Sequence, residues 1–200
     1  MPAAGSSTVA CLADATAPTP PTVLDNCGRT LTVSAAVPGA DPACAGTKTY
    51  TFTYTLCDNT TQTWVYTYTI SAPTVTMPAA GSSTVACLAD ATPPTPPTVL
   101  DNCGRTLTVS AAVPGADPAC AGTKTYTFTY TLCDNTTQTW VYTYTISAPT
   151  VTMPAAGSST VACLAAATAP TPPVVTDNCG RTLTVSAGVP GTDPVCAGPK

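Results

Sequence analysis

The sequence TKTYTFTYTLCDNTTQTWVYTYTI, residues 47–70, decides the fold. Large apolar side chains such as Phe52 and Trp64 alternate with threonines on both sides of the segment CDNTTQ. A period of two places successive side chains on opposite faces of a β-strand. We therefore predict an antiparallel hairpin that turns at Asp58 and Asn59, with its aromatic side chains on one face.

The aromatic face of this hairpin needs a covering layer, because a lone hairpin is not stable in water. A strand of a facing sheet is predicted where apolar residues alternate with polar ones, at Leu31, Val33, Ala35 and Val37. Val9 and residues 21–24 are expected to add edge strands, where proline is tolerated. The predicted fold is all-β, with each unit a β-sandwich.

The unit repeats along the chain. The phrase MPAAGSSTVACLA begins at Met1 and again at Met77 and Met153, a period of 76 residues. Copies one and two differ only where Ala17 is replaced by Pro93. Self-similarity this close is typical of one structural unit stacked in a row, and we expect these 200 residues to be a window of a longer array.

Cysteines recur with the same period. The chain has eleven cysteines, four in each complete unit, and no histidine to complete a zinc site. An even number per unit indicates disulfides formed in an oxidising compartment. The cysteines expected to form disulfides are Cys11, Cys27, Cys44, Cys57, Cys87, Cys103, Cys120, Cys133, Cys163 and Cys196.

Chain direction constrains the pairing. A strand of about 3.3 Å per residue separates Cys44 from Cys57, too far for a bond that needs Cα atoms within about 7 Å. Antiparallel neighbouring strands place Cys27 with Cys57 at one pole and Cys11 with Cys44 at the other. The predicted bonds are Cys11–Cys44, Cys27–Cys57, Cys87–Cys120, Cys103–Cys133 and Cys163–Cys196, with Cys179 unpaired because its partner lies beyond the sequence. Pairing of Cys11 with Cys57 and of Cys27 with Cys44 remains an alternative.

Charge is sparse and excludes several functions. Only 8% of residues are charged and the net charge is −4, so no basic stripe for nucleic acid is expected. Without histidine or glutamate we expect no catalysis and no cofactor. Asp25, Asp41 and Asp58 are interpreted as turn residues rather than calcium ligands. Arg29 and Lys48 are expected to keep the surface soluble, and no segment is apolar enough to insert into a membrane.

Threonine is abundant, and threonines on a strand face that meets water suit β-structure. A second interpretation is glycosylation. Threonine and proline interleave as in mucin-like stalks at the candidate O-glycosylation sites Thr16, Thr19, Thr22, Thr92, Thr95 and Thr98. The candidate N-glycosylation sites are Asn59 and Asn135, each followed by two threonines.

Three stretches together resemble the hyalin repeat (HYR) domain. They are PTVTMPAAGSSTVAC from Pro73, PPTVLDNCGRTLTVS from Pro96 and AGTKTYTFTYTLCDNTTQTWVYTYTIS from Ala121, of which DNCG is the most specific. The resemblance implies immunoglobulin-like modules and an adhesive or scaffolding role in large secreted surface proteins of Bacteroidota. When the chain is aligned with this domain, three modules are expected. Residues 1–72 lack the first strand, residues 73–148 form a complete module, and residues 149–200 lack the final hairpin.

These observations predict a non-enzymatic structural segment of an extracellular bacterial filament or cell-surface stalk. The short Ala72-Pro73 joint has little slack, so disulfide-bonded modules in series would form a semi-rigid rod. The expected partner is the protein itself, as neighbouring repeats or as identical chains in a fibre. The alternative is an adhesin whose modules bind extracellular glycans or a host surface, which would need exposed tyrosines where the alternation predicts core.

Overall fold

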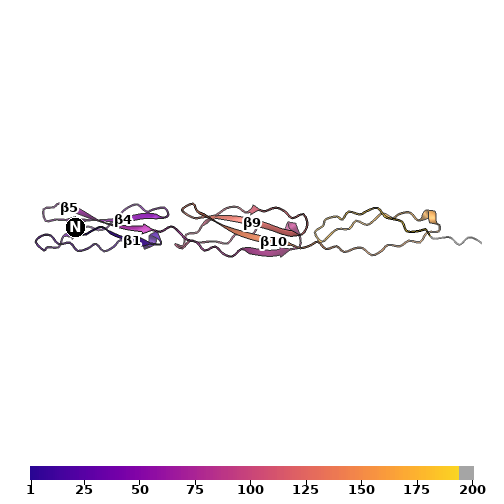
Figure 1. Cartoon of the computed structure of the whole chain (residues 1–200), viewed down its shortest axis with the longest axis horizontal. Coiled ribbons are helices and arrows are strands. Elements are labelled where there is room, and N and C mark those ends of the chain that lie inside the picture. Colours follow the sequence, from indigo (N-terminus) through magenta and orange to yellow (C-terminus); the bar gives the residue numbers. More distant parts are fainter. Residues whose placement is uncertain (194–200) are drawn as a thin grey trace, which may run out of the picture. The chain divides into compact units, whose positions relative to one another are not determined.

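A computed structural model describes residues 1–193. The first repeat contains one five-stranded sheet in the order β1-β5-β4-β2, with β3 also paired to β4 (Figure 1). Its strands are β1 (Gly5–Val9), β2 (Thr32–Val33), β3 (Val37–Pro38), β4 (Gly46–Thr55) and β5 (Thr61–Ile70). The described chain divides into two compact units. The first comprises residues 1–81, 94–113 and 126–142, and the second the remaining segments.

The second repeat has the same topology as the first, in the order β6-β10-β9-β7 with β8 on β9. Its strands are β6 (Gly81–Val85), β7 (Thr108–Val109), β8 (Val113–Pro114), β9 (Gly122–Thr131) and β10 (Thr137–Ile146). Each repeat also has one short 3₁₀ turn after its first cysteine, at η1 (Leu12–Asp14), η2 (Leu88–Asp90) and η3 (Leu164–Ala166). Apart from η3, the described part of the third repeat forms isolated bridges rather than strands. The prediction of all-β tandem repeats is confirmed.

The predicted hairpin is confirmed in register and in turn. Strands β4 and β5 pair antiparallel with Phe52 opposite Trp64. At the turn, the Leu56 backbone N–H donates to the Thr60 carbonyl at 2.8 Å. Asn59 takes a φ of 65°, which asparagine tolerates better than most residues. The turn therefore occurs where the Asp-Asn pair predicts it.

The segment that contains Pro18, Pro20 and Pro21, rather than a second sheet, covers the aromatic face. Phe52, Tyr54 and Trp64 form the buried cluster. The Tyr54 hydroxyl donates to the Pro21 carbonyl at 2.6 Å, and the Trp64 indole N–H donates to the Ala3 carbonyl at 2.7 Å. Tyrosine and tryptophan combine a large apolar body with one donor. They can therefore pack against an irregular backbone and still satisfy its carbonyls.

The strand predicted for a facing sheet lies elsewhere. Its two short pieces, β2 and β3, pair with β4 in the same sheet, with Val33 opposite Tyr54 and Val37 opposite Thr51. Val33 and Val37 are exposed by 41% and 60%, so the predicted inward face is wrong there. Leu31 does pack against the aromatic cluster. The expected edge strand at Val9 is confirmed as β1, whereas residues 21–24 contribute only an isolated bridge at Leu24.

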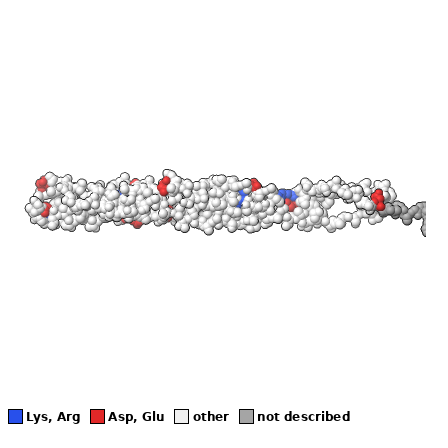
Figure 2. All heavy atoms as spheres, viewed as in Figure 1, with Lys and Arg blue, Asp and Glu red and all other residues white. Residues whose placement is uncertain are grey.

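Lys48 is not the solubilising surface residue that its sequence context suggested. It is 7% exposed, its ammonium donates to the Gly39 carbonyl at 2.7 Å, and it forms an ion pair with Asp41. The ammonium also lies 5.7 Å from the centre of the Tyr50 ring, within range of a cation–π contact. The visible surface consequently carries few charges (Figure 2). Within residues 1–193, no helix has the length and hydropathy that a membrane span requires.

Candidate functional site: the junctions between repeats

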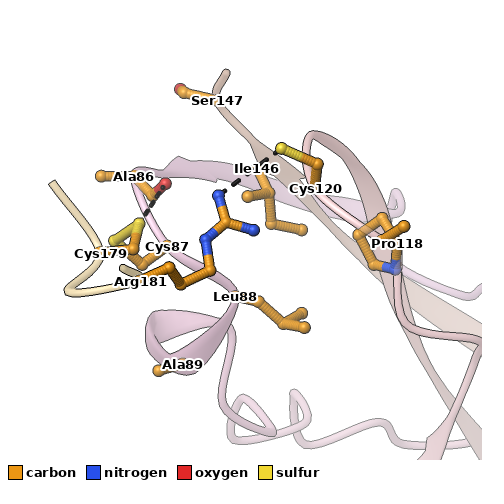
Figure 3. A pocket seen from close by; sticks show the side chains of 11 residues that line it. Ala86, Cys87, Leu88, Ala89, Pro118, Cys120, Ile146, Ser147, Cys179 and Arg181 are labelled. Atoms are coloured by element: carbon orange, nitrogen blue, oxygen red, sulfur yellow. Dashed lines mark hydrogen bonds between the residues drawn. A yellow bond between two sulfur atoms is a disulfide. The ribbon is translucent and has the colours of Figure 1, made fainter. Parts of the chain in front are cut away.

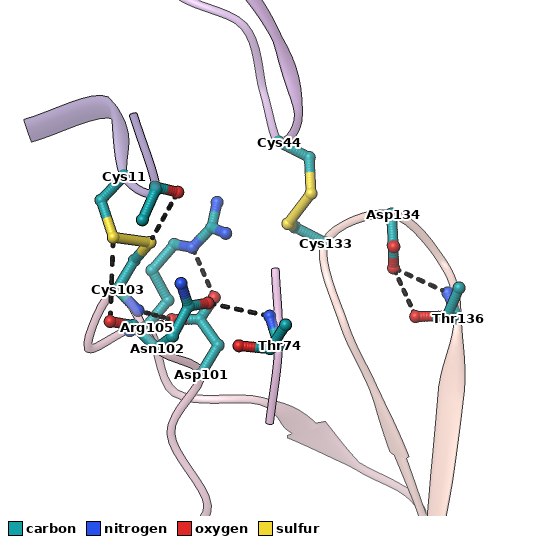
Figure 4. The surroundings of a disulfide bond; sticks show 11 residues. Cys11, Cys44, Thr74, Asp101, Asn102, Cys103, Arg105, Cys133, Asp134 and Thr136 are labelled. Carbon is teal, nitrogen blue, oxygen red and sulfur yellow. Dashed lines mark hydrogen bonds and ion pairs between the residues drawn. A yellow bond between two sulfur atoms is a disulfide. The ribbon is translucent and has the colours of Figure 1, made fainter. Parts of the chain in front are cut away.

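Every disulfide in the described chain joins two different repeats. Cys11 bonds Cys103, and Cys44 bonds Cys133, so two disulfides connect the first repeat to the second (Figure 4). Cys87 bonds Cys179 and connects the second repeat to the third. The Cα atoms of each pair are 5.5 Å apart, as disulfide geometry requires. Successive repeats are therefore joined by disulfides in addition to the backbone.

The predicted pairs within one repeat are wrong, although the predicted poles are right. Gly46 and Val9 both pair with Ile70, which places the neighbouring Cys44 and Cys11 at one end of the sheet. We call this the trailing end of the repeat. The opposite end, which we call the leading end, carries the second and fourth cysteines of the repeat.

Cysteines that share an end each bond across the junction, not to one another. The first and third cysteines at the trailing end bond the second and fourth cysteines at the leading end of the next repeat. The pairs Cys11–Cys44, Cys27–Cys57, Cys87–Cys120 and Cys103–Cys133 are therefore not formed, and neither is the alternative of Cys11–Cys57 with Cys27–Cys44. Cys179, predicted to be unpaired, is bonded to Cys87.

Four cysteines of the described chain are free: Cys27, Cys57, Cys120 and Cys163, all of them exposed. Their positions agree with the pairing at the first junction, where the first and third cysteines of one repeat bond the second and fourth of the next. Cys27 and Cys57 are the second and fourth cysteines of the first repeat, at its leading end. Cys120 and Cys163 are a third and a first cysteine, which in the first junction bond the following repeat. Cys196 lies outside the described residues.

The DNCG loop, residues 101–104 in the second repeat, is built around one carboxylate. Asp101 accepts the backbone N–H groups of Cys103 and Arg105 at 2.9 Å each, and the Arg105 side chain at 2.8 Å. Gly104 has a φ of 76°, a left-handed conformation that favours glycine. These contacts fix the loop that presents Cys103 to the preceding repeat. The corresponding loops, residues 25–28 and 177–180, repeat the same bonds.

The same loop holds the chain that links the repeats. The Asn102 backbone N–H donates to the Thr74 carbonyl at 2.9 Å, and the Thr74 N–H donates to the Asn102 side-chain oxygen at 2.8 Å. Asn178 and Thr150 make the same two contacts at the second junction. Asn102 and Thr74 were missed as junction residues by sequence reasoning. The signal available was the DNCG motif itself, whose asparagine recurs in all three copies.

Electrostatics favour an ionised aspartate in each DNCG loop. Hydrogen bonding from the Arg29 backbone is the main influence that lowers the pKa of Asp25. Burial acts most strongly on Asp101 and raises its pKa. Hydrogen bonds from the Arg105 backbone and side chain outweigh burial, so the net pKa of Asp101 is lowered. The carboxylate is therefore charged in both environments and accepts hydrogen bonds throughout.

A pocket of 340 Å³ lies beside the free Cys120 thiol (Figure 3). Its lining includes the disulfide partners Cys87 and Cys179, and the Arg181 guanidinium donates to the Cys120 sulfur at 3.5 Å. In the first junction the corresponding cysteine, Cys44, is bonded to Cys133 on the β9–β10 hairpin turn. The pocket therefore lies at the position that corresponds to the Cys44–Cys133 disulfide of the first junction.

The candidate glycosylation sites are all exposed. They are Thr16, Thr19, Thr22, Thr92, Thr95, Thr98, Asn59 and Asn135. Every tyrosine and tryptophan in the chain is at least half-buried, as the alternation predicts. Across residues 1–193 no three acidic or cysteine side chains gather as a set that could hold a metal ion.

Comparison with known proteins agrees with this periodic organisation. The family model described as "HYR-like domain with 4 cysteines" matches residues 1–70, 75–146 and 151–200. No curated protein matches the chain. The family is one of structural or adhesion modules rather than enzymes. The three matches cover nearly the whole chain, and the second and third begin close to the points where one repeat passes into the next. The chain therefore belongs to the family of HYR-like domains with four cysteines, as a tandem array.

Proposed function

We propose that the chain is a non-enzymatic structural segment of an extracellular filament or cell-surface stalk, whose repeats are held in fixed succession by disulfides. One observation carries the proposal. Two disulfides connect the first repeat to the second within a single compact unit, and two hydrogen bonds between Thr74 and Asn102 hold the linking chain at the same junction. A junction with this many constraints resists bending far better than a flexible linker.

The composition supports an extracellular location. Disulfides persist in oxidising surroundings, and small modules outside the cell use them to supplement small cores. The few charges and many exposed threonines suit a surface that meets water without recruiting nucleic acid. Glycans on exposed threonines and lateral association of identical repeats belong to the same proposal.

A glycan-binding adhesin has less support. Sugar rings stack on exposed aromatic faces, yet Trp64, Tyr54 and their counterparts in the second repeat lie in the core. The tyrosines that are only half-buried, such as Tyr66 and Tyr68, pack against one another with their rings tilted by 54° and their ring centres 4.9 Å apart. The structural role is therefore the function that the described residues favour.

Two measurements test the proposal. An antibody against the repeat should label intact cells of the source organism, and small-angle scattering of the chain should change on reduction from a stiff to a flexible profile. Labelling only after cell lysis, or scattering from the oxidised chain typical of freely jointed modules, would overturn the structural role. Selective binding of the oxidised chain to a glycan array would favour the adhesin instead.

A further inference from the structure

The order of the disulfides along the chain has a mechanical consequence. Each bond spans a sequence separation of about 90 residues, and successive bonds overlap: Cys87 precedes Cys103 in the sequence although it belongs to the next bond. A covalent path can therefore cross from Cys11 to Cys103, return along the backbone to Cys87, and cross again to Cys179. This path leaves out most of the polypeptide.

We propose that the array bears tension along this disulfide-linked path, so that unfolding of its repeats cannot lengthen it beyond the extended length of the path. Along the path from residue 1 to residue 200, the backbone segments are 10, 16 and 21 residues long, about 47 in all, against 199 steps along the chain. The hairpins β4–β5 and β9–β10 lie outside it. The mechanical role rests on the proposed structural function, whereas the limit on length follows from the bonds alone.

The segment between Cys87 and Cys103 is suited to carry load. It contains Pro93, Pro94, Pro96 and Pro97. Proline-rich chain favours the polyproline II conformation, which rises about 3.1 Å per residue, close to the limit of about 3.3–3.6 Å for a fully extended chain. The Tyr130 hydroxyl donates to the Pro97 carbonyl at 2.6 Å and holds this segment against the sheet. Outside the 3₁₀ turn η2 at Leu88–Asp90, little slack remains for tension to remove.

A second path runs beside the first. Cys44 bonds Cys133, and the backbone then returns along strand β9 to Cys120, the free thiol at the next junction. Strand β9 is already extended, so this path has as little slack as the proline-rich one. Within residues 1–193 only the Cys44–Cys133 crossing of this second path is closed, and the second path therefore sets no shorter limit than the path through Cys11 and Cys87.

Force spectroscopy of the oxidised full-length chain tests the proposal. The chain is held by handles at its two termini, and its free thiols are blocked by alkylation. We expect the fully unfolded oxidised chain to extend to about 160 Å and the reduced chain to about 700 Å, a gain of roughly fourfold. Contour length after unfolding depends on the bonds present, so the readout does not require the repeats to stay folded.

Two serine pairs give a matched control. Cys11→Ser with Cys103→Ser opens the shorter path, and the oxidised chain should extend to about 370 Å. Cys44→Ser with Cys133→Ser removes one disulfide of the same junction but leaves the shorter path intact, so the length should stay near 160 Å. A variant that fails to form its remaining bonds is identified by its free-thiol count.

Two outcomes overturn the inference. Bonds within each repeat would give the oxidised wild-type chain a length near 350 Å, and equal lengthening in both serine pairs would show that neither path limits extension. A trypsin digest without reductant gives an independent check. Peptide 106–124 should be released with Cys120 unpaired, and linkage of this peptide to residues 49–105 would place the bond within a repeat. Neither result depends on cell-surface labelling, so the structural function can fail or stand separately.

Discussion

Two DNCG loops of identical sequence, residues 25–28 and residues 101–104, lie in different surroundings. The second loop is bonded to the preceding repeat through Cys103, whereas Cys27 of the first is free and exposed. The internal hydrogen bonds are the same in both loops, since Asp25 and Asp101 accept equivalent groups. The loop is therefore formed by its own sequence, and docking adds to a structure that already exists.

Contact with the first repeat changes the burial of side chains at the leading end of the second repeat. Val99, Leu107 and Leu132 are 4%, 7% and 7% exposed, whereas their counterparts in the first repeat are only half-buried. The Asp101 side chain is 3% exposed, against 9% for Asp25. The neighbouring repeat thus completes the apolar packing of the end that it meets. Stability in this array is shared between a repeat and its junction, as in other tandem-repeat proteins.

The largest expected effect falls on the core, where the two repeats should not differ. Phe52 and Phe128 are both 3% exposed, so Phe52→Ala and Phe128→Ala should each lower the free energy of unfolding by about 3–5 kcal/mol. Denaturant unfolding measures both. A clear inequality between the two variants would mean that docking reaches into the core and is not confined to the junction.

A smaller effect should separate the two loops. Asp101→Ala leaves the N–H groups of Cys103 and Arg105 without their buried carboxylate acceptor in a partly buried loop, which should destabilise by about 1–3 kcal/mol. Asp25→Ala should destabilise less, because water can reach the same groups in the exposed loop. Denaturant unfolding of both variants gives the difference. Equal losses would contradict the burial contrast between the loops.

Hydrogen exchange should distinguish the loops at one amide. The Asn102 N–H donates to the Thr74 carbonyl at 2.9 Å, and across residues 1–193 no equivalent acceptor meets Asn26. We expect the Asn102 amide to exchange more slowly by about tenfold or more. Thr74→Pro would leave the acceptor but remove the N–H that pairs with the Asn102 side chain, and should reduce the protection. Similar exchange rates at Asn26 and Asn102 would argue against the contact.

The smallest effect on stability is expected when the pH is lowered. The pKa values of Asp25, Asp58, Asp101, Asp134 and Asp177 are lowered in the folded chain. A carboxylate with a lowered pKa stabilises the fold above its unfolded pKa, near pH 4, and this contribution is lost as the pH falls through the folded value. Thermal stability should be level above about pH 5 and decline below pH 4. Because both loops carry the same hydrogen bonds, Asp25→Asn and Asp101→Asn should each weaken the decline.

Local signals in the sequence predicted the hairpin and its turn. Alternation around Phe52 and Trp64 is a property of consecutive residues, so the two strands can be predicted without knowledge of the rest of the fold. The covering layer was harder, because the proline-rich segment has no periodic pattern and its role depends on tyrosine and tryptophan donors that reach its carbonyls. The inward face assigned to Val33 and Val37 was wrong, since their strand breaks into two short pieces on the edge of the same sheet.

The poles of the cysteines were also predictable, but their partners were not. Strand direction places Cys11 and Cys44 at one end, and that inference needs only one repeat. Cys27 and Cys103 occupy the same position in nearly identical sequences, so no local property of the chain distinguishes a bond within the repeat from a bond to the next. Only packing of one repeat against another decides between them. The two contacts between Asn102 and Thr74 belong to the same category.

The one-directional bonding rule affects how such a gene can change in length. The two complete repeats each carry their first and third cysteines at one end and their second and fourth at the other, so recombination that adds or deletes whole 76-residue blocks would leave no cysteine of such a repeat with a mismatched neighbour. Unequal crossing-over between near-identical copies would then produce longer or shorter proteins that all fold by the same pairing. Copy number can drift, or be selected, without any accompanying change in the module.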